Sequence, residues 1–164
     1  MNATKIRKIQ AIGIFLFIGL VLEGIALFTN GWIFINLLFV TYSYGIVPYY
    51  SYNPFWYNFS SWLMYISFGM YIVVAFAFLH AVIRIRQHGC SQKIRHSFNA
   101  ISSVATIIGT FEGVAFIEFA INTSNYGGLH LTTLGYSAYL ALISAIFTFL
   151  ASGLSQHVRI YDCC

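Results

Sequence analysis

The sequence predicts an all-α membrane protein: a left-handed bundle of four transmembrane helices with a small extracellular β-sheet or hairpin built from the first outer loop. Hydrophobic residues make up 59% of the chain and charged residues only 7%. A soluble domain carries about 25% charged residues, so the solvent expected around this chain is lipid. Four apolar stretches are each long enough to cross about 30 Å of hydrocarbon as a helix: 9–32, 62–84, 98–121 and 134–158.

The distribution of basic residues predicts the orientation of these helices. All eight lysines and arginines precede the first stretch, lie at the end of the second or between the second and the third, or follow the fourth: Lys5, Arg7, Lys8, Arg84, Arg86, Lys93, Arg95 and Arg159. By the positive-inside rule both termini and the inner loop 85–97 are cytoplasmic, and the outer loops 33–61 and 122–133 face outward. Residues 1–164 are expected to form a single tetraspan domain.

The first outer loop is rich in aromatic and β-branched residues, which favours short strands. Tyrosine and tryptophan are also common at protein–protein hot spots. The residues expected to contact a partner are Trp32, Tyr49, Tyr50, Tyr52, Phe55, Trp56 and Tyr57. The alternative is that these rings cover the top of the bundle, with Trp32 and Trp62 in an interfacial belt.

Small residues recur at spacings of three and four in two of the predicted helices. The fourth stretch contains Ser137, Ala141, Ser144, Thr148, Ser152 and Ser155, and the third contains Ser102, Thr106, Gly109 and Gly113. Such stripes allow membrane helices to approach closely. We expect them to face other helices of the same bundle, with a face toward a second protein as the alternative.

Three carboxylates, Glu23, Glu112 and Glu118, fall inside predicted membrane spans, where an ionised side chain costs several kcal/mol. One interpretation is that Glu23 and Glu112 mark an ion path or a polar contact with a partner helix. The other is a protonated carboxyl group that bonds to a hydroxyl such as that of Thr110 and locks two helices together. Glu118 lies close to the outer end of its helix and is expected to reach water.

The remaining polar residues indicate modification rather than catalysis. Asn58 begins a glycosylation sequon in the first outer loop. Cys90, Cys163 and Cys164 lie close to predicted inner helix ends and are candidates for palmitoylation, with free thiols as the alternative. No metal-ligand spacing, phosphate-binding loop or catalytic triad pattern is present, so neither a cofactor nor enzymatic activity is expected. The basic residues flank membrane spans, so no nucleic acid is expected as a partner.

Several short segments resemble a known tetraspan superfamily. They are Thr29-Asn-Gly-Trp32 after the first stretch, Gly45-Ile46, the segment Leu134-Gly-Tyr-Ser-Ala-Tyr-Leu140, and the cysteines Cys90 and Cys163-Cys164. With the tetraspan layout, they make the chain similar to the claudin, peripheral myelin protein and calcium-channel gamma-subunit (AMPA-receptor regulatory protein) superfamily. The chain resembles a divergent member, because it lacks the family's first-loop cysteine pair. The resemblance implies an outer β-sheet and favours the plasma membrane.

These observations together predict a non-enzymatic tetraspan that acts through lateral and extracellular protein contacts. The leading expectation is an auxiliary subunit of a larger channel or receptor complex in the membrane. One alternative is a claudin-like junction or adhesion protein that self-assembles. A second is a small ion or proton transporter, or a channel oligomer, that uses Glu23 and Glu112.

Cysteine placement gives a direct test of the predicted topology. Both outer loops lack cysteine, so no disulfide is expected to brace the extracellular sheet. We expect a reducing agent to leave the melting temperature of the detergent-solubilised protein unchanged. A decrease of several degrees would contradict the assignment of the loops.

Overall fold

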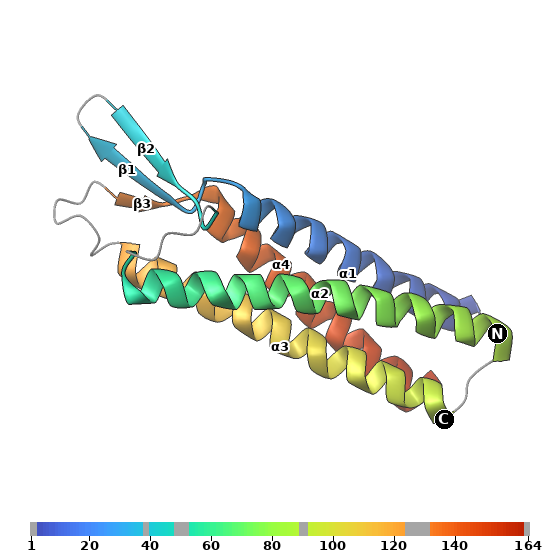
Figure 1. Cartoon of the computed structure of the whole chain (residues 1–164). Coiled ribbons are helices and arrows are strands. Elements are labelled where there is room, and N and C mark those ends of the chain that lie inside the picture. The colour runs from blue at the N-terminus through green and yellow to red at the C-terminus, as the bar shows by residue number, and fades with distance from the viewer. Residues whose placement is uncertain (1–2, 38–39, 48–52, 89–91, 124–131, 163–164) are drawn as a thin grey trace.

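Four long helices pack side by side and carry a small sheet at one end (Figure 1). This computed structural model describes residues 3–37, 40–47, 53–88, 92–123 and 132–162. The helices are α1 (Ala3–Phe28), α2 (Phe55–His88), α3 (Gln92–Thr123) and α4 (Tyr136–His157), and a short π-helical segment, η1 (Val158–Asp162), continues α4. Each of the four is long and apolar enough to span a membrane. The predicted four-helix membrane fold is confirmed.

The helices follow one another around the bundle in the order α1, α4, α3, α2. Helix α4 packs extensively on both α1 and α3, and α3 packs extensively on α2. The seam between α1 and α2 is less closely packed. A groove of about 590 Å³ runs along this seam and is lined by apolar residues that include Gly13, Phe17 and Phe78.

Helix α4 buries small and polar side chains and turns large apolar ones outward. On α4 the predicted small-residue stripe is buried along its whole length: Ser137, Ala141, Ser144, Thr148, Ser152 and Ser155. The same helix exposes Ile143, Ile146 and Phe149. This arrangement suits lipid, where apolar side chains face acyl chains without cost and hydroxyl groups need partners inside the protein.

Hydroxyl groups join α3 to α4 near the basic end of the bundle. Ser102 and Ser152 face each other with 3.0 Å between their Oγ atoms, and Ser102 also donates to the backbone carbonyl of Ser152 at 3.1 Å. The hydroxyl of Thr106 lies 2.8 Å from that of Ser152. Part of the predicted stripe on α3 therefore serves contacts within the bundle, whereas a Cβ at Gly113 would meet open space.

The predicted outer sheet is present, and it has three strands. Strand β1 (Ile33–Leu37) pairs with β2 (Val40–Tyr44) on one side and with β3 (Thr132–Leu134) on the other, both antiparallel. Two strands come from the first outer loop, as predicted, and β3 adds a third from the second outer loop. An isolated two-stranded hairpin is only marginally stable, and β3 fixes β1 to the start of α4.

The helices extend beyond the stretches that hydropathy marks. Helix α2 begins at Phe55, seven residues before the predicted start at 62, directly after Asn53-Pro54. Proline suits the first turn of a helix because it has no N–H to leave unpaired, and the N–H of Asn58 donates to the Pro54 carbonyl at 3.1 Å. Helix α2 ends at His88 and α3 begins at Gln92, so both continue into the predicted inner loop. Hydropathy therefore predicts which residues are apolar enough to lie in the membrane, but it does not predict where the helices begin and end.

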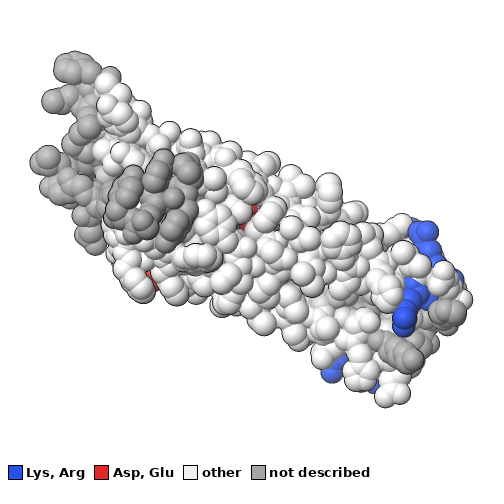
Figure 2. Space-filling view, viewed as in Figure 1, with Lys and Arg blue, Asp and Glu red and all other residues white. Residues whose placement is uncertain are grey.

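Charge is separated along the long axis of the molecule. Lysine and arginine side chains gather at the end opposite the sheet, which we call the basic end (Figure 2). The helix ends near the sheet carry none. This separation is the pattern behind the topology prediction, in which the basic end is cytoplasmic.

Two glycines allow the sheet to approach the bundle closely. The N–H of Gly135 donates to the Trp32 carbonyl at 2.8 Å, and that of Ser137 donates to the Gly31 carbonyl at 2.9 Å. A Cβ at Gly135 would overlap the backbone carbonyl of Gly31. Any side chain at Gly135 therefore requires the backbone to move.

We expect Gly135→Ala to destabilise the protein by about 1–3 kcal/mol through this overlap. The control is Gly153→Ala on α4, where a Cβ meets no atom within 4 Å and the helix gains propensity. Thermal unfolding in detergent should show a lower melting temperature for the first variant and an equal or higher one for the second. Equal melting temperatures for both variants would contradict the close approach.

Candidate functional site

Trp32 belongs to an aromatic cluster that closes the bundle beneath the sheet. Its side chain is fully buried, its Nε1 donates to the Ala26 carbonyl at 2.6 Å, and its ring centroid lies 4.6 Å from that of Phe119. Trp56 and Tyr57 pack on the same phenylalanine with centroids 5.5 and 5.2 Å away. We call Trp32, Trp56, Tyr57 and Phe119 the aromatic cap.

Burial of the aromatic cap corrects two predicted contact residues. Trp32 and Tyr57 were expected at a partner surface, and Trp32 alternatively in an interfacial belt, but both side chains are buried inside the protein. The Tyr57 hydroxyl donates to the Gly45 carbonyl at 2.5 Å and so ties the chain after β2 to α2. Trp32 and Tyr57 therefore cover the top of the bundle, as the alternative interpretation expects. Trp56 is half-buried beside them.

Exposed aromatic residues lie on two surfaces next to the cap. Phe55, Phe59 and Trp62 follow one another at spacings of four and three on α2, and Phe55 is 84% exposed. On β2, all five residues are exposed, including Tyr42 and Tyr44. Tyr49, Tyr50 and Tyr52 lie outside the described residues. The alternation Thr41-Tyr42-Ser43-Tyr44 in the sequence indicates this strand.

Strand β2 forms one edge of the sheet, because the strand order is β2-β1-β3. One row of its backbone N–H and C=O groups faces β1, and the other row faces away from the sheet. Its sequence, Val-Thr-Tyr-Ser-Tyr, has no charged residue and no proline. Charged residues and prolines usually protect an edge strand from pairing with another chain, and β2 lacks both.

Glu23 and Glu112 are fully buried in the middle of the bundle. Glu112 on α3 accepts a hydrogen bond from Ser144 on α4 at 2.6 Å, and Ser144 also lies 2.9 Å from the Gly19 carbonyl of α1. The Tyr71 hydroxyl of α2 contacts Thr148 and lies 3.2 Å from the Ser144 hydroxyl. This buried network therefore touches all four helices.

Glu23 joins α1 to α2 at the same level of the bundle. Its Oε1 accepts a hydrogen bond from Ser67 on α2. Its Oε2 is buried, with no hydrogen-bond partner in the described part of the chain. Thr110, an expected partner for a buried carboxyl group, is exposed and donates to the Thr106 carbonyl of its own helix at 2.8 Å. The hydroxyl groups that bond these acids come from α2 and α4.

The remaining predicted residues lie apart from this network. Glu118 is half-buried and accepts a hydrogen bond from Asn122 at 3.0 Å. Asn58 is half-buried in the first turn of α2 and donates to the Asn53 carbonyl at 3.1 Å, so its glycosylation stays a prediction. Cys90, Cys163 and Cys164 lie outside the described residues, and their lipidation stays a prediction. The described residues include no group of three potential metal-ligating His, Cys, Asp or Glu side chains.

The fold and these sites define an integral membrane protein of the tetraspan class, with four apolar helices and a small antiparallel sheet. The whole chain, residues 1–164, matches the family model described as "Tight junction protein, Claudin-like". The chain belongs to this claudin-like family, which confirms the resemblance drawn from its short motifs. A search of the curated proteins found no match.

The buried network predicts a specific response to substitution at Glu112. Glu112→Leu removes the acceptor of Ser144, and we expect a loss of about 1–3 kcal/mol in unfolding free energy. Glu112→Gln keeps a carbonyl acceptor and should lose less. Thr110→Val, on the exposed face of the same helix, is the control, and thermal unfolding in detergent is the measurement.

The same variants separate a structural role from transport. With a structural role, proteoliposomes that contain the wild-type protein carry no proton or cation flux beyond that of empty liposomes. Flux that Glu112→Gln abolishes, together with a Glu112→Leu variant as stable as wild type, would contradict the structural role.

Proposed function

We propose that this protein is a non-enzymatic contact protein that assembles with further copies of itself through the sheet end. The observation that carries the proposal is the exposed edge strand β2. Members of the claudin-like family are generally non-enzymatic, which supports a contact function. The family description names a tight junction protein, which supports a role at contacts between cells.

The sequence of β2 suits pairing with a second copy of itself. In an antiparallel pair centred on Tyr42, Val40 lies opposite Tyr44 of the other copy, and Thr41 lies opposite Ser43. Aromatic–β-branched pairs and hydroxyl pairs of this kind each contribute about 0.2–1 kcal/mol. A two-fold axis through Tyr42 joins the same surface on both copies, as closed dimers require.

A second candidate function is that of an auxiliary subunit of a larger channel or receptor complex. It is favoured by the exposed stripe of Phe55, Phe59 and Trp62, which offers aromatic area to a neighbouring membrane protein. The small-residue stripe of α4 does not contribute to such a surface, because it is buried within the bundle.

The self-pairing proposal predicts the effect of charge at the centre of β2. Two ammonium groups would lie opposite each other in a pair of Tyr42→Lys copies, and we expect about fivefold weaker association, equivalent to about 1 kcal/mol. The measurement is co-purification in mild detergent of two differently tagged copies. The control is Thr133→Lys, an exposed position on β3 at the opposite edge.

Opposite charges distinguish self-assembly from an auxiliary role. Mixing Tyr42→Lys copies with Tyr42→Glu copies should restore association, because the pair then attracts. Association of Tyr42→Lys copies at the wild-type level would refute self-pairing through β2. Recovery of a stoichiometric larger complex, lost in a Phe55→Ala/Trp62→Ala variant, would instead support the auxiliary role.

A further inference from the structure

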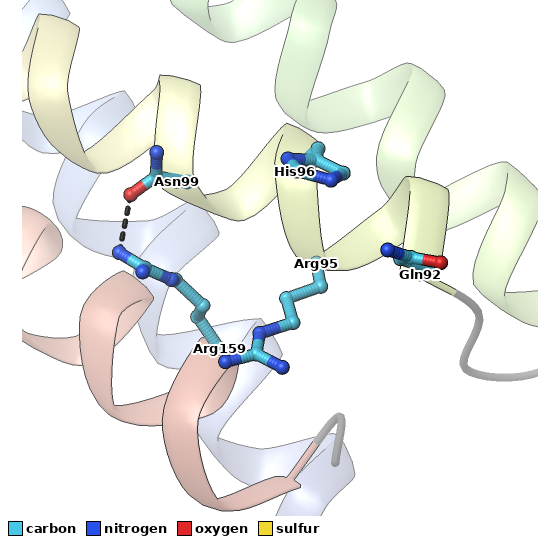
Figure 3. A pocket seen from close by; sticks show the side chains of 5 residues that line it. All are labelled: Gln92, Arg95, His96, Asn99 and Arg159. Carbon is cyan, nitrogen blue, oxygen red and sulfur yellow. Dashed lines mark hydrogen bonds between the residues drawn. The ribbon is translucent and has the colours of Figure 1, made fainter.

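A polar pocket of about 220 Å³ lies at the basic end, between the first turns of α3 and segment η1 (Figure 3). The pocket is lined by Gln92, Arg95, His96 and Asn99 from α3 and by Arg159 from η1. The pocket is smaller than the roughly 300–1,000 Å³ of sites that enclose drug-sized ligands. It has room for a small polar group.

The two arginines approach the pocket from different elements. The half-buried Arg159 donates through Nη1 to Oδ1 of Asn99, which holds its guanidinium against α3. The exposed Arg95 extends from α3 toward the backbone of η1 near Arg159. A guanidinium carries five N–H donors and a single side-chain amide accepts only some of them, so donors remain for a ligand.

Charge at this end of the molecule favours an anion. The chain has only four acidic residues. Glu23 and Glu112 lie in the middle of the bundle and Glu118 lies near the sheet, so three of the four acidic residues lie away from the basic end. Gln92 is the first residue of α3, and the unpaired backbone N–H groups of a helix start add partial positive charge.

The pocket lies at the ends of two candidate membrane spans. The apolar span of α3 begins at Ile94, next to Arg95, and the span that includes α4 ends at Ile160, next to Arg159. Each arginine is the second residue from the end of its candidate span, so both are expected near the boundary between hydrocarbon and headgroups. The positive-inside pattern predicts that this boundary belongs to the cytoplasmic leaflet, which is rich in anionic lipids.

We propose that the pocket binds a phosphate monoester, with Arg95 and Arg159 as its ligands. Guanidinium groups bind phosphate oxygens in a bidentate manner, and a monoester presents three terminal oxygens with a charge of about −1.5 to −2. A phosphodiester headgroup offers fewer oxygens and less charge. The same chemistry is available on a phosphoinositide in the membrane and on free phosphate compounds in the cytosol.

The test uses the full chain in nanodiscs of phosphatidylcholine that contain phosphatidylinositol bisphosphate, with binding read by native mass spectrometry. We expect Arg95→Gln to weaken binding of this lipid about tenfold, as loss of a charge-assisted pair implies. Arg159→Gln should weaken it similarly. Arg84→Gln is the matched control, because it removes one charge at the same end from an exposed site outside the pocket lining.

Three results would overturn the proposal. One is an equal loss of binding in Arg84→Gln, since diffuse attraction then explains the effect. The others are binding of phosphatidylserine as tightly as the bisphosphate lipid, and unchanged binding in Arg95→Gln. Arg159→Gln removes the Arg159–Asn99 hydrogen bond and could disturb η1. Arg95 is exposed, so Arg95→Gln is expected to fold and keeps the test valid in that case.

A second arm identifies the source of the phosphate group. Inorganic phosphate and inositol bisphosphate are titrated against the protein in nanodiscs of phosphatidylcholine alone. Arg95-dependent binding of the soluble compounds at the affinity of the lipid supports a site for free phosphate compounds. Arg95-dependent binding of the lipid alone supports a phosphoinositide site.

Discussion

The fold depends on hydrogen bonds between helices in a solvent that offers none. Lipid surrounds the large apolar side chains equally well whether the helices associate or separate, so the hydrophobic effect does little to hold the bundle together. Close packing of small residues and interhelical hydrogen bonds must do so. At mid-depth, Glu112 contacts Ser144 and joins α3 to α4, and Glu23 contacts Ser67 and joins α1 to α2. Ser144 also lies within hydrogen-bond distance of the Gly19 carbonyl of α1 and the Tyr71 hydroxyl of α2, so the two pairs are connected. Ser102 and Ser152 form a second link between α3 and α4 nearer the basic end.

The aromatic cap performs a different task at the sheet end. A sheet of three short strands lacks a core of its own, because β2 is exposed along its length. Trp32, Tyr57 and Phe119 supply that core by packing between the helix ends and the sheet, and the close approach of Gly31 to Gly135 completes the joint. The orientation of β2 is therefore set by the bundle beneath it, and any contact made through β2 inherits that orientation.

Hydropathy, charge distribution and residue spacing predicted the spans, the sheet and the buried stripe of α4, because each reflects a simple period or a bulk preference. These patterns did not predict a strand in the second outer loop. Thr132–Leu134 is too short to show a pattern, and its pairing depends on where Gly135 lies against Gly31. The identity of the hydroxyl groups that bond Glu23 and Glu112 was also out of reach, because it depends on how helices rotate against one another. The prediction that Trp32 lies at a partner surface or in an interfacial belt was wrong. A tryptophan at the end of a span looks the same in sequence whether it faces lipid or its own protein.

The unequal helix contacts bear on how the chain is made. Helix α1 packs mainly on α4, and its seam with α2 is loose enough to leave a groove beside Gly13. During synthesis the first span therefore emerges long before its principal neighbour. At about 5–20 residues per second, the delay between Phe28 and Tyr136 is on the order of ten seconds. The hydrogen-bond partner of the Glu23 carboxyl group, Ser67, lies on the second span and is made early, whereas the bundle can close only after α4 has been made.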